Sequence, residues 1–114
     1  MILKDGVSIA KITDAMREGA TAVAECYAAY HCDCVVTSGD EATSAHHGKP
    51  VEGGTLDPHY EGKALDFRLW NVPWDKRAGL VRAITETLGD EYVVLWENKG
   101  DAREHLHCQL GHVA

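Results

Sequence analysis

The chain has 114 residues, of which 45% are hydrophobic and 25% are charged, and its formal net charge is −7. This length predicts a single domain over residues 1–114 with one hydrophobic core, and the composition is typical of a soluble globular protein. We expect a monomer. The negative charge argues against nucleic acid as a partner, because phosphate binding needs clustered lysine and arginine. It also argues against tight adhesion to anionic lipid or to a polyanionic wall polymer.

The sequence shows no sign of a membrane span or a secretory leader. No apolar run reaches the length of a transmembrane helix, so we expect no membrane insertion. The first six residues lack the basic and then apolar layout of a signal peptide. Three expectations remain open: a protein that works in the cytoplasm, a protein released to the cell wall by a phage-type lysis system, or a chain whose leader is missing.

The first half of the chain predicts a helix, a strand and a long loop. Apolar residues recur at helical spacing from Ser8 to about Tyr30, and Ser8 or Thr13 is the expected cap. Gly19 weakens the middle of this helix, so a break there is an alternative. The β-branched segment Cys34–Ser38 predicts a short buried strand, which Gly39 ends.

Residues 40–58 are polar, rich in glycine and without periodicity. A loop of nearly twenty residues is uncommon in a compact domain and is usually functional. We expect it to pass over the functional site and to bring His46 and His47 near it. The alternative is that both histidines simply face solvent.

The second half of the chain predicts strands around one helix. The expected elements are a strand over Ala64–Trp70, a turn over Asn71–Asp75, a helix from Trp74 to about Leu88, a strand over Glu91–Trp96, a turn over Asn98–Asp101 and a strand over His105–Leu110. Gly89 is the expected helix stop. These elements are too few and too closely spaced for a wound parallel sheet. We therefore predict an α+β fold, with helices packed against a small antiparallel sheet.

Two clusters of polar residues suggest a metal site. His59 lies in a turn and Asp66 in an apolar strand, and these two side chains can converge on one point. Burying Asp66 without a partner would cost several kcal/mol or keep the carboxyl group protonated, and a metal ion is one way to stabilise it. The segment Glu104–His107 near the C-terminus offers a third ligand and a base.

Taken together, these clusters resemble the zinc peptidases of the M15 type. This group contains D-alanyl-D-alanine dipeptidases and carboxypeptidases and phage L-alanyl-D-glutamate endopeptidases, and it shares a fold with the Hedgehog signalling domain. The resemblance covers roughly residues 34–110, and its motifs are Val35–Gly39, His59-Tyr60-x-Gly62-x-Ala64-x-Asp66, Val93–Glu97 and Glu104-x-x-His107. It implies a Hedgehog/DD-peptidase-like fold and one Zn²⁺ held by His59, Asp66 and His107.

The resemblance also implies catalytic roles for Glu104 and His105. Glu104 occupies the position of the base that takes a proton from the metal-bound water. Alternate strand residues share a face, so Glu104 reaches the side of His107 only if the chain bends or if Glu104 precedes the strand, and we favour the latter. His105 then lies on the side of His107 as an oxyanion stabiliser, an outer partner of the ligands or an alternative ligand.

The substrate anchor of the resembling peptidases has no counterpart in this chain. Many of them carry an arginine just after Ser-Gly that holds a substrate carboxylate, whereas this chain has Asp40 and Glu41 there. Arg68 or Lys49 is the expected substitute, assisted by a loop histidine. The alternative for Arg68 is an ion pair with Asp40, Glu41 or Glu61.

The cysteines and the motifs together define the functional hypotheses. We expect Cys26, Cys32, Cys34 and Cys108 to be small buried thiols; a disulfide, or a thiolate metal site with His31, is the alternative. The first functional hypothesis is a zinc peptidase that cuts peptidoglycan stem peptides at an L-Ala–D-Glu or a D-Ala–D-Ala bond. The second is a non-catalytic, zinc-stabilised binding module of the same fold. A metal-storage or redox protein that uses the cysteines is a weaker third.

Overall fold

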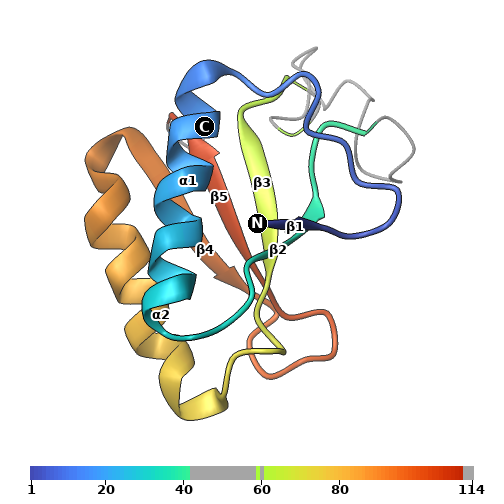
Figure 1. Ribbon diagram of the computed structural model, residues 1–114. Helices are drawn as coiled ribbons and strands as arrows, with labels where there is room; N and C mark the ends of the chain where they lie inside the picture. Colours follow the sequence, from blue (N-terminus) through green and yellow to red (C-terminus); the bar gives the residue numbers. More distant parts are fainter. Residues whose placement is uncertain (42–58, 60, 112–114) are drawn as a thin grey trace.

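The computed structural model of the protein describes residues 1–41, 59 and 61–111. In these residues two α-helices pack on one five-stranded sheet, which confirms the predicted α+β class (Figure 1). The helices are α1 (Asp14–Ala29) and α2 (Trp74–Leu88), and a short 3-10 turn, η1 (Gly89–Glu91), follows α2. The strands are β1 (Ile2–Leu3), β2 (Val35–Ser38), β3 (Ala64–Arg68), β4 (Tyr92–Glu97) and β5 (His105–Leu110).

The sheet is mixed rather than antiparallel throughout. Its strand order is β1-β2-β3-β5-β4, and the pairs β2–β3, β3–β5 and β5–β4 are antiparallel as predicted. At the edge, however, β1 pairs parallel with β2. The purely antiparallel prediction is therefore wrong there. β1 has two residues, both exposed, so it is too short to show the alternation that identifies a strand in a sequence.

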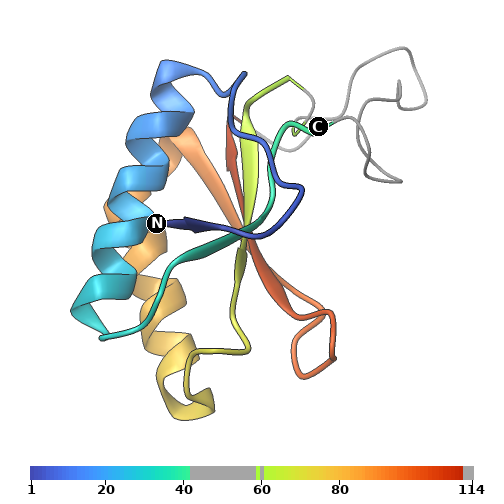
Figure 2. The ribbon, with the colours of Figure 1, turned by 45° about the vertical axis from the view of Figure 1, so that its right-hand side comes forward.

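Both helices cover the same face of the sheet (Figures 1 and 2). Leu65 and Phe67 of β3 and Leu106 and Cys108 of β5 are fully buried in the core beneath these helices. Because successive strand residues point to opposite faces, the residues between them lie on the other face, which neither helix covers. We call this the open face of the sheet, and it carries the candidate site.

Helix α1 begins at Asp14, six residues after the predicted start at Ser8. Of the two expected caps, Thr13 is the one used, because its hydroxyl oxygen accepts the Met16 N–H at 3.1 Å. The backbone before it is committed elsewhere, since the Ser8 N–H donates to Glu41 and the Ser8 carbonyl accepts from Asp40. The helix is continuous through Gly19, and a Cβ at this position would lie 2.8 Å from the Tyr92 ring.

The other predicted elements lie close to their predicted bounds. α2 and β5 have the predicted limits, and Gly89 ends α2 with a φ of 74°, which favours glycine. β2 begins one residue later than predicted, and both ends of β4 are shifted by one residue towards the C-terminus. β3 ends two residues earlier than predicted, at Arg68. Neither described helix combines the length and the apolar character that crossing a bilayer requires.

Candidate metal centre

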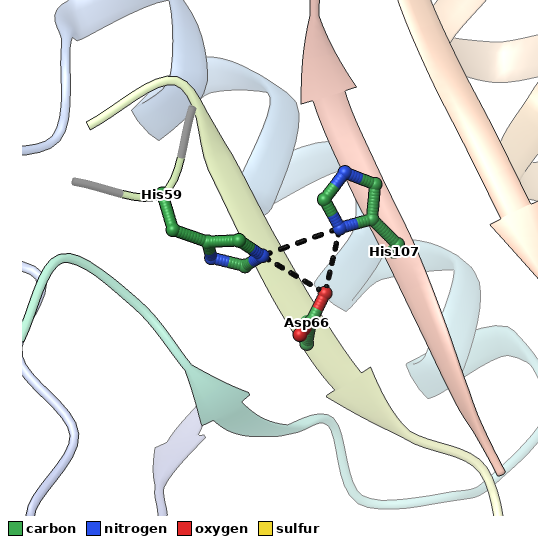
Figure 3. Close-up of side chains that lie close together, drawn as sticks. All are labelled: His59, Asp66 and His107. Carbon is green, nitrogen blue, oxygen red and sulfur yellow. Dashed lines mark hydrogen bonds and ion pairs between the residues drawn. The ribbon is translucent and has the colours of Figure 1, made fainter. Parts of the chain in front are cut away.

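Three segments bring His59, Asp66 and His107 together on the open face (Figure 3). Asp66 in the middle of β3 stands directly opposite His107 of β5 in the antiparallel register. His59 approaches from the chain before β3, where its carbonyl accepts the Gly62 N–H at 3.0 Å. Gly62 has a φ of 75° and passes so close to the Lys11 carbonyl that a Cβ would collide with it. Glycine at position 62 therefore permits the close backbone approach that positions His59.

The spacing of the three side chains suits a tetrahedral metal ion. His59 Nε2 lies 3.2 Å from both Asp66 Oδ1 and His107 Nδ1, and His107 Nδ1 lies 2.8 Å from Asp66 Oδ1. Ligand atoms at about 2.0–2.1 Å from a tetrahedral zinc ion are about 3.3 Å apart. The three atoms thus already occupy nearly one face of such a tetrahedron. One carboxylate oxygen and two imidazole nitrogens are also donors that zinc prefers.

Electrostatics in the group favour a charged Asp66. Burial alone would raise the pKa of Asp66, but the hydrogen bonds and positive charge of His107 and His59 outweigh it and hold that pKa well below its usual range. Burial likewise would lower the pKa of His107, but hydrogen bonds to Asp66 and Gln109 raise it above its ordinary value. An ionised carboxylate is the form that binds a metal.

Gln109 fixes the orientation of the His107 ring. The two residues are neighbours on the open face of β5, and His107 Nε2 lies 3.0 Å from Gln109 Oε1. An amide oxygen only accepts, so His107 Nε2 carries a hydrogen that it donates to Gln109. The nitrogen left for a metal is Nδ1, the atom that faces Asp66 and His59.

A second group on the open face adjoins the first, and it contains a residue that the sequence did not single out for a role. Glu97, the last residue of β4, pairs in register with His105 of β5. Glu97 Oε1 lies 3.0 Å from His105 Nε2 and 4.0 Å from His107 Nδ1. His105 Nε2 is also 3.8 Å from Asp66 Oδ2, so His105 lies beside the metal group, as predicted. Asp66 belongs to both groups.

The structure does not place the Glu104 carboxylate with the ligands. Glu104 precedes β5, as predicted, but its side chain is buried and points to the helix-covered side. Its Oε1 accepts from Arg77 of α2 at 2.5 Å, and its Oε2 accepts from Trp96 Nε1 at 2.6 Å. Trp96 pairs with the buried Leu106, which identifies this side as the core face. Both carboxylate oxygens are thus engaged away from His107.

The acidic residues at the expected anchor position stabilise the backbone instead. Asp40 is buried and accepts the Lys11 N–H at 2.5 Å. Glu41 accepts the N–H groups of Ser8 and Gly39 at 3.0 and 2.9 Å. These bonds join the chain after β2 to the segment before α1, so neither carboxylate is offered to a substrate.

Arg68 is the one expected substrate-binding residue that the structure describes. It lies two positions after Asp66 in β3 and therefore on the open face. The alternative ion pair is not found, because in the described part of the chain Arg68 makes none with Asp40, Glu41 or Glu61. The other three predicted contributors, His46, His47 and Lys49, lie outside the described residues.

The cysteines are free thiols on or near the core. Cys34 and Cys108 are buried and Cys26 and Cys32 are half-buried, so the expectation of buried thiols is confirmed for two of the four. Burial raises the pKa of Cys34 to about 12. Within the described residues, neither group that could hold a metal contains a cysteine or His31.

Comparison with protein families and with curated proteins found no match. No protein-family model matches the chain, and no curated protein matches it in sequence. The inference of function therefore rests on the residues of the centre.

Proposed function

We propose that the protein is a zinc-dependent peptidase that hydrolyses peptidoglycan stem peptides. The observation that carries the proposal is the convergence of His59, Asp66 and His107 on the open face of the sheet, with their ligand atoms 2.8 to 3.2 Å apart. The resemblance of these residues and their spacing to the M15-type peptidases supplies the substrate class: an L-Ala–D-Glu or a D-Ala–D-Ala bond.

The residues around the centre support hydrolysis rather than mere metal storage. His59, Asp66 and His107 would hold a zinc ion, which would lower the pKa of a coordinated water towards about 7 and so make a nucleophile available at neutral pH. Proton transfer then needs a carboxylate beside the ligands whose oxygens are not both occupied by hydrogen bonds within the core. Glu97 meets this requirement, because its Oε1 is 4.0 Å from His107 Nδ1 and its side chain is 43% exposed. We therefore assign the base to Glu97 in place of Glu104.

His105 holds Glu97 in position. Its Nε2 is 3.0 Å from Glu97 Oε1, and its Nδ1 is 2.9 Å from the Arg103 carbonyl. Both ring nitrogens thus have a neighbour that fixes the plane of the imidazole. A hydrogen bond from His105 also orients the Glu97 carboxylate toward the ligand group.

Metal analysis and product masses test the proposal. Purified protein should carry one zinc per chain, and digestion of purified stem peptides should release fragments whose masses identify the cut bond. His59→Ala and His107→Ala should remove both the metal and the activity. Stoichiometric zinc without hydrolysis of any stem peptide would leave the non-catalytic, zinc-stabilised binding module as the function.

A further inference from the structure

A cavity on the open face begins at the candidate metal centre and extends away from it. Its volume is about 380 Å³. Asp66 of the centre lines the cavity, and so does His105, which belongs to the adjoining group with Glu97. The residue after β1, strands β2 and β3, and the chain that leads into β5 line the cavity, and the lining residues include Lys4, Thr37, Ser38, Arg68 and Trp70. A substrate group bound at the metal would have this space beside it.

Arg68 is built into the wall of this cavity with free hydrogen-bonding capacity. Its Nε is buried and has no hydrogen-bond partner among the described residues. Its Cζ lies 4.6 Å from the ring centroid of Trp70, a side chain that is 62% exposed at the cavity. The Arg68 carbonyl accepts the Tyr27 hydroxyl at 2.7 Å, which anchors the backbone behind the side chain. The guanidinium is therefore held in place, and it has no anionic partner among the residues that the structure describes.

Lys4 supplies a second positive charge to the cavity, from the far side of β2 relative to β3. It follows β1, and its N–H donates to the Val36 carbonyl at 2.9 Å, which fixes this stretch beside β2. Its side chain is exposed and makes no ion pair with any residue that the structure describes. Thr37 and Ser38, which lie between the two cations, are uncharged.

The other charged residues of the cavity are already neutralised. Glu104 is paired with Arg77 at 2.5 Å, and Arg103 is paired with Asp101 at 3.4 Å. Asp66 has two histidine nitrogens within 3.2 Å, and it is a candidate metal ligand. The uncompensated charge of the cavity therefore comes from Lys4 and Arg68, although the whole chain carries −7. A small anionic group is the ligand that this arrangement suits.

We propose that Arg68 and Lys4 form a subsite for a carboxylate of the substrate. This inference rests on the proposed function and narrows it to peptides with a free carboxylate close to the scissile bond. Asp66 and Arg68 are two residues apart on one strand, a separation of about 6.5 Å. An extended peptide covers about 3.3–3.6 Å per residue, so the carboxylate lies within about two residues of the cut bond.

The chemistry of Arg68 gives the subsite its selectivity. The planar guanidinium matches a carboxylate in a bidentate fork, and stacking on Trp70 restricts its orientation before substrate binds. Lys4 adds a point charge without directional preference. Replacement of the substrate carboxylate by a carboxamide should therefore remove most of the interaction with the subsite.

Binding of matched carboxylate and carboxamide peptides tests the subsite. One pair is L-alanyl-γ-D-glutamyl-L-lysine in which the α-carboxylate of the D-glutamyl residue is either free or amidated. The other is a stem pentapeptide ending in D-Ala–D-Ala, with a free or an amidated C-terminus. Dissociation constants are measured by calorimetry on the zinc-loaded Glu97→Gln variant, in which the peptides should survive. We expect at least one carboxylate peptide to bind about 10- to 100-fold more tightly than its amide.

Variants on this background locate the selectivity. The quantity compared is the ratio of the dissociation constant of the amide peptide to that of the carboxylate peptide. Arg68→Gln should reduce this ratio to below about two, and Arg68→Lys should give an intermediate ratio. Lys4→Gln should lower the ratio about threefold or more. Lys99→Gln removes the same charge at the β4–β5 turn, over Trp96, and should keep the ratio of the parent. Lys4 is exposed, so this arm remains decisive if Arg68→Gln fails to fold.

Equal binding of both members of each pair, or a ratio that survives both Arg68→Gln and Lys4→Gln, would overturn the subsite. These results are separable from the fate of the proposed function. Hydrolysis by the wild type without any carboxylate preference keeps the function and removes the subsite. A carboxylate preference that depends on Arg68, without hydrolysis, keeps the subsite and removes the function.

Discussion

Two separate variants, Glu104→Gln and Glu97→Gln, should distinguish a residue that stabilises the β4–β5 hairpin from one that acts in catalysis. Glu104 has a side chain that is 3% exposed, and its partner Arg77 is 13% exposed. In Glu104→Gln one carboxylate oxygen becomes an NH₂ group that faces the N–H of either Arg77 or Trp96. Removing one partner of a buried ion pair costs about 3–5 kcal/mol, because the other charge stays buried. The unfolding midpoint should fall by about 10–25 °C.

Glu97→Gln should have the opposite profile. The Glu97 side chain is 43% exposed, so the loss of its pairing with His105 should lower the free energy of unfolding by about 1 kcal/mol or less. An amide does not accept the proton of a coordinated water, so turnover should fall about 10²–10⁴-fold. Zinc content should stay near one per chain, because His59, Asp66 and His107 are unchanged.

The assay combines urea unfolding, followed by tryptophan fluorescence, with initial rates of stem-peptide hydrolysis at a temperature where each variant is folded. Arg77→Gln is the matched control, since it breaks the same ion pair from the other side and should be destabilised to a similar degree while it retains turnover. If Glu104→Gln unfolds like the wild type and has lost turnover, Glu104 is the base and the assignment to Glu97 is refuted.

Three further predictions follow from the geometry of the centre and the core. Gln109→Leu should weaken zinc binding about 10- to 100-fold in a competition titration with a chromophoric chelator, because it releases the ring of His107; an unchanged affinity would mean that Gln109 does not orient the ring. Zinc at 1,000 times its dissociation constant should raise the free energy of unfolding by about 4 kcal/mol in the wild type and by little in His59→Ala, as urea titrations with and without metal would measure; equal stabilisation of both proteins would place the metal elsewhere. Under native conditions a thiol reagent should modify Cys26 and Cys32 well before Cys34 and Cys108, because burial disfavours the thiolates of the latter two; rapid modification of all four would contradict the packing of the core.

The elements that the sequence predicted well are those with a long or clean period. α2 shows regular apolar spacing and ends at Gly89, and β5 alternates polar and apolar residues, so their bounds agree with the structure. The start of α1 was placed too early because its apolar positions continue into the segment before Asp14. That segment is committed to Asp40 and Glu41, partners about thirty residues away that no local pattern reveals.

The same distinction between local and distant information applies to the site. The spacing of His59 and Asp66 showed only that the two side chains can converge, and the resemblance implied that they do so with His107. The structure brings the three together. The position of the base depends also on how the strands pair with one another. Strand alternation already places Glu104 and His107 on opposite faces. Only the register of β4 with β5 shows that Glu97 stands opposite His105. The assignment of Glu97 thus needed the pairing register of the β4–β5 hairpin, which the sequence does not determine.

The distance of Glu97 from the ligands is consistent with the proposal of a catalytic metal. Structural zinc sites are closed by four protein ligands, whereas catalytic sites keep one position for water. The atoms of His59, Asp66 and His107 are 2.8 to 3.2 Å apart, close to the edge of a zinc tetrahedron. Glu97 Oε1 is 4.0 Å from His107 Nδ1, which is longer than the edge of about 3.3 Å that a fourth ligand would make. In the proposed peptidase, a carboxylate at this distance would lie outside the ligand tetrahedron and could accept a hydrogen bond from a water at its open position.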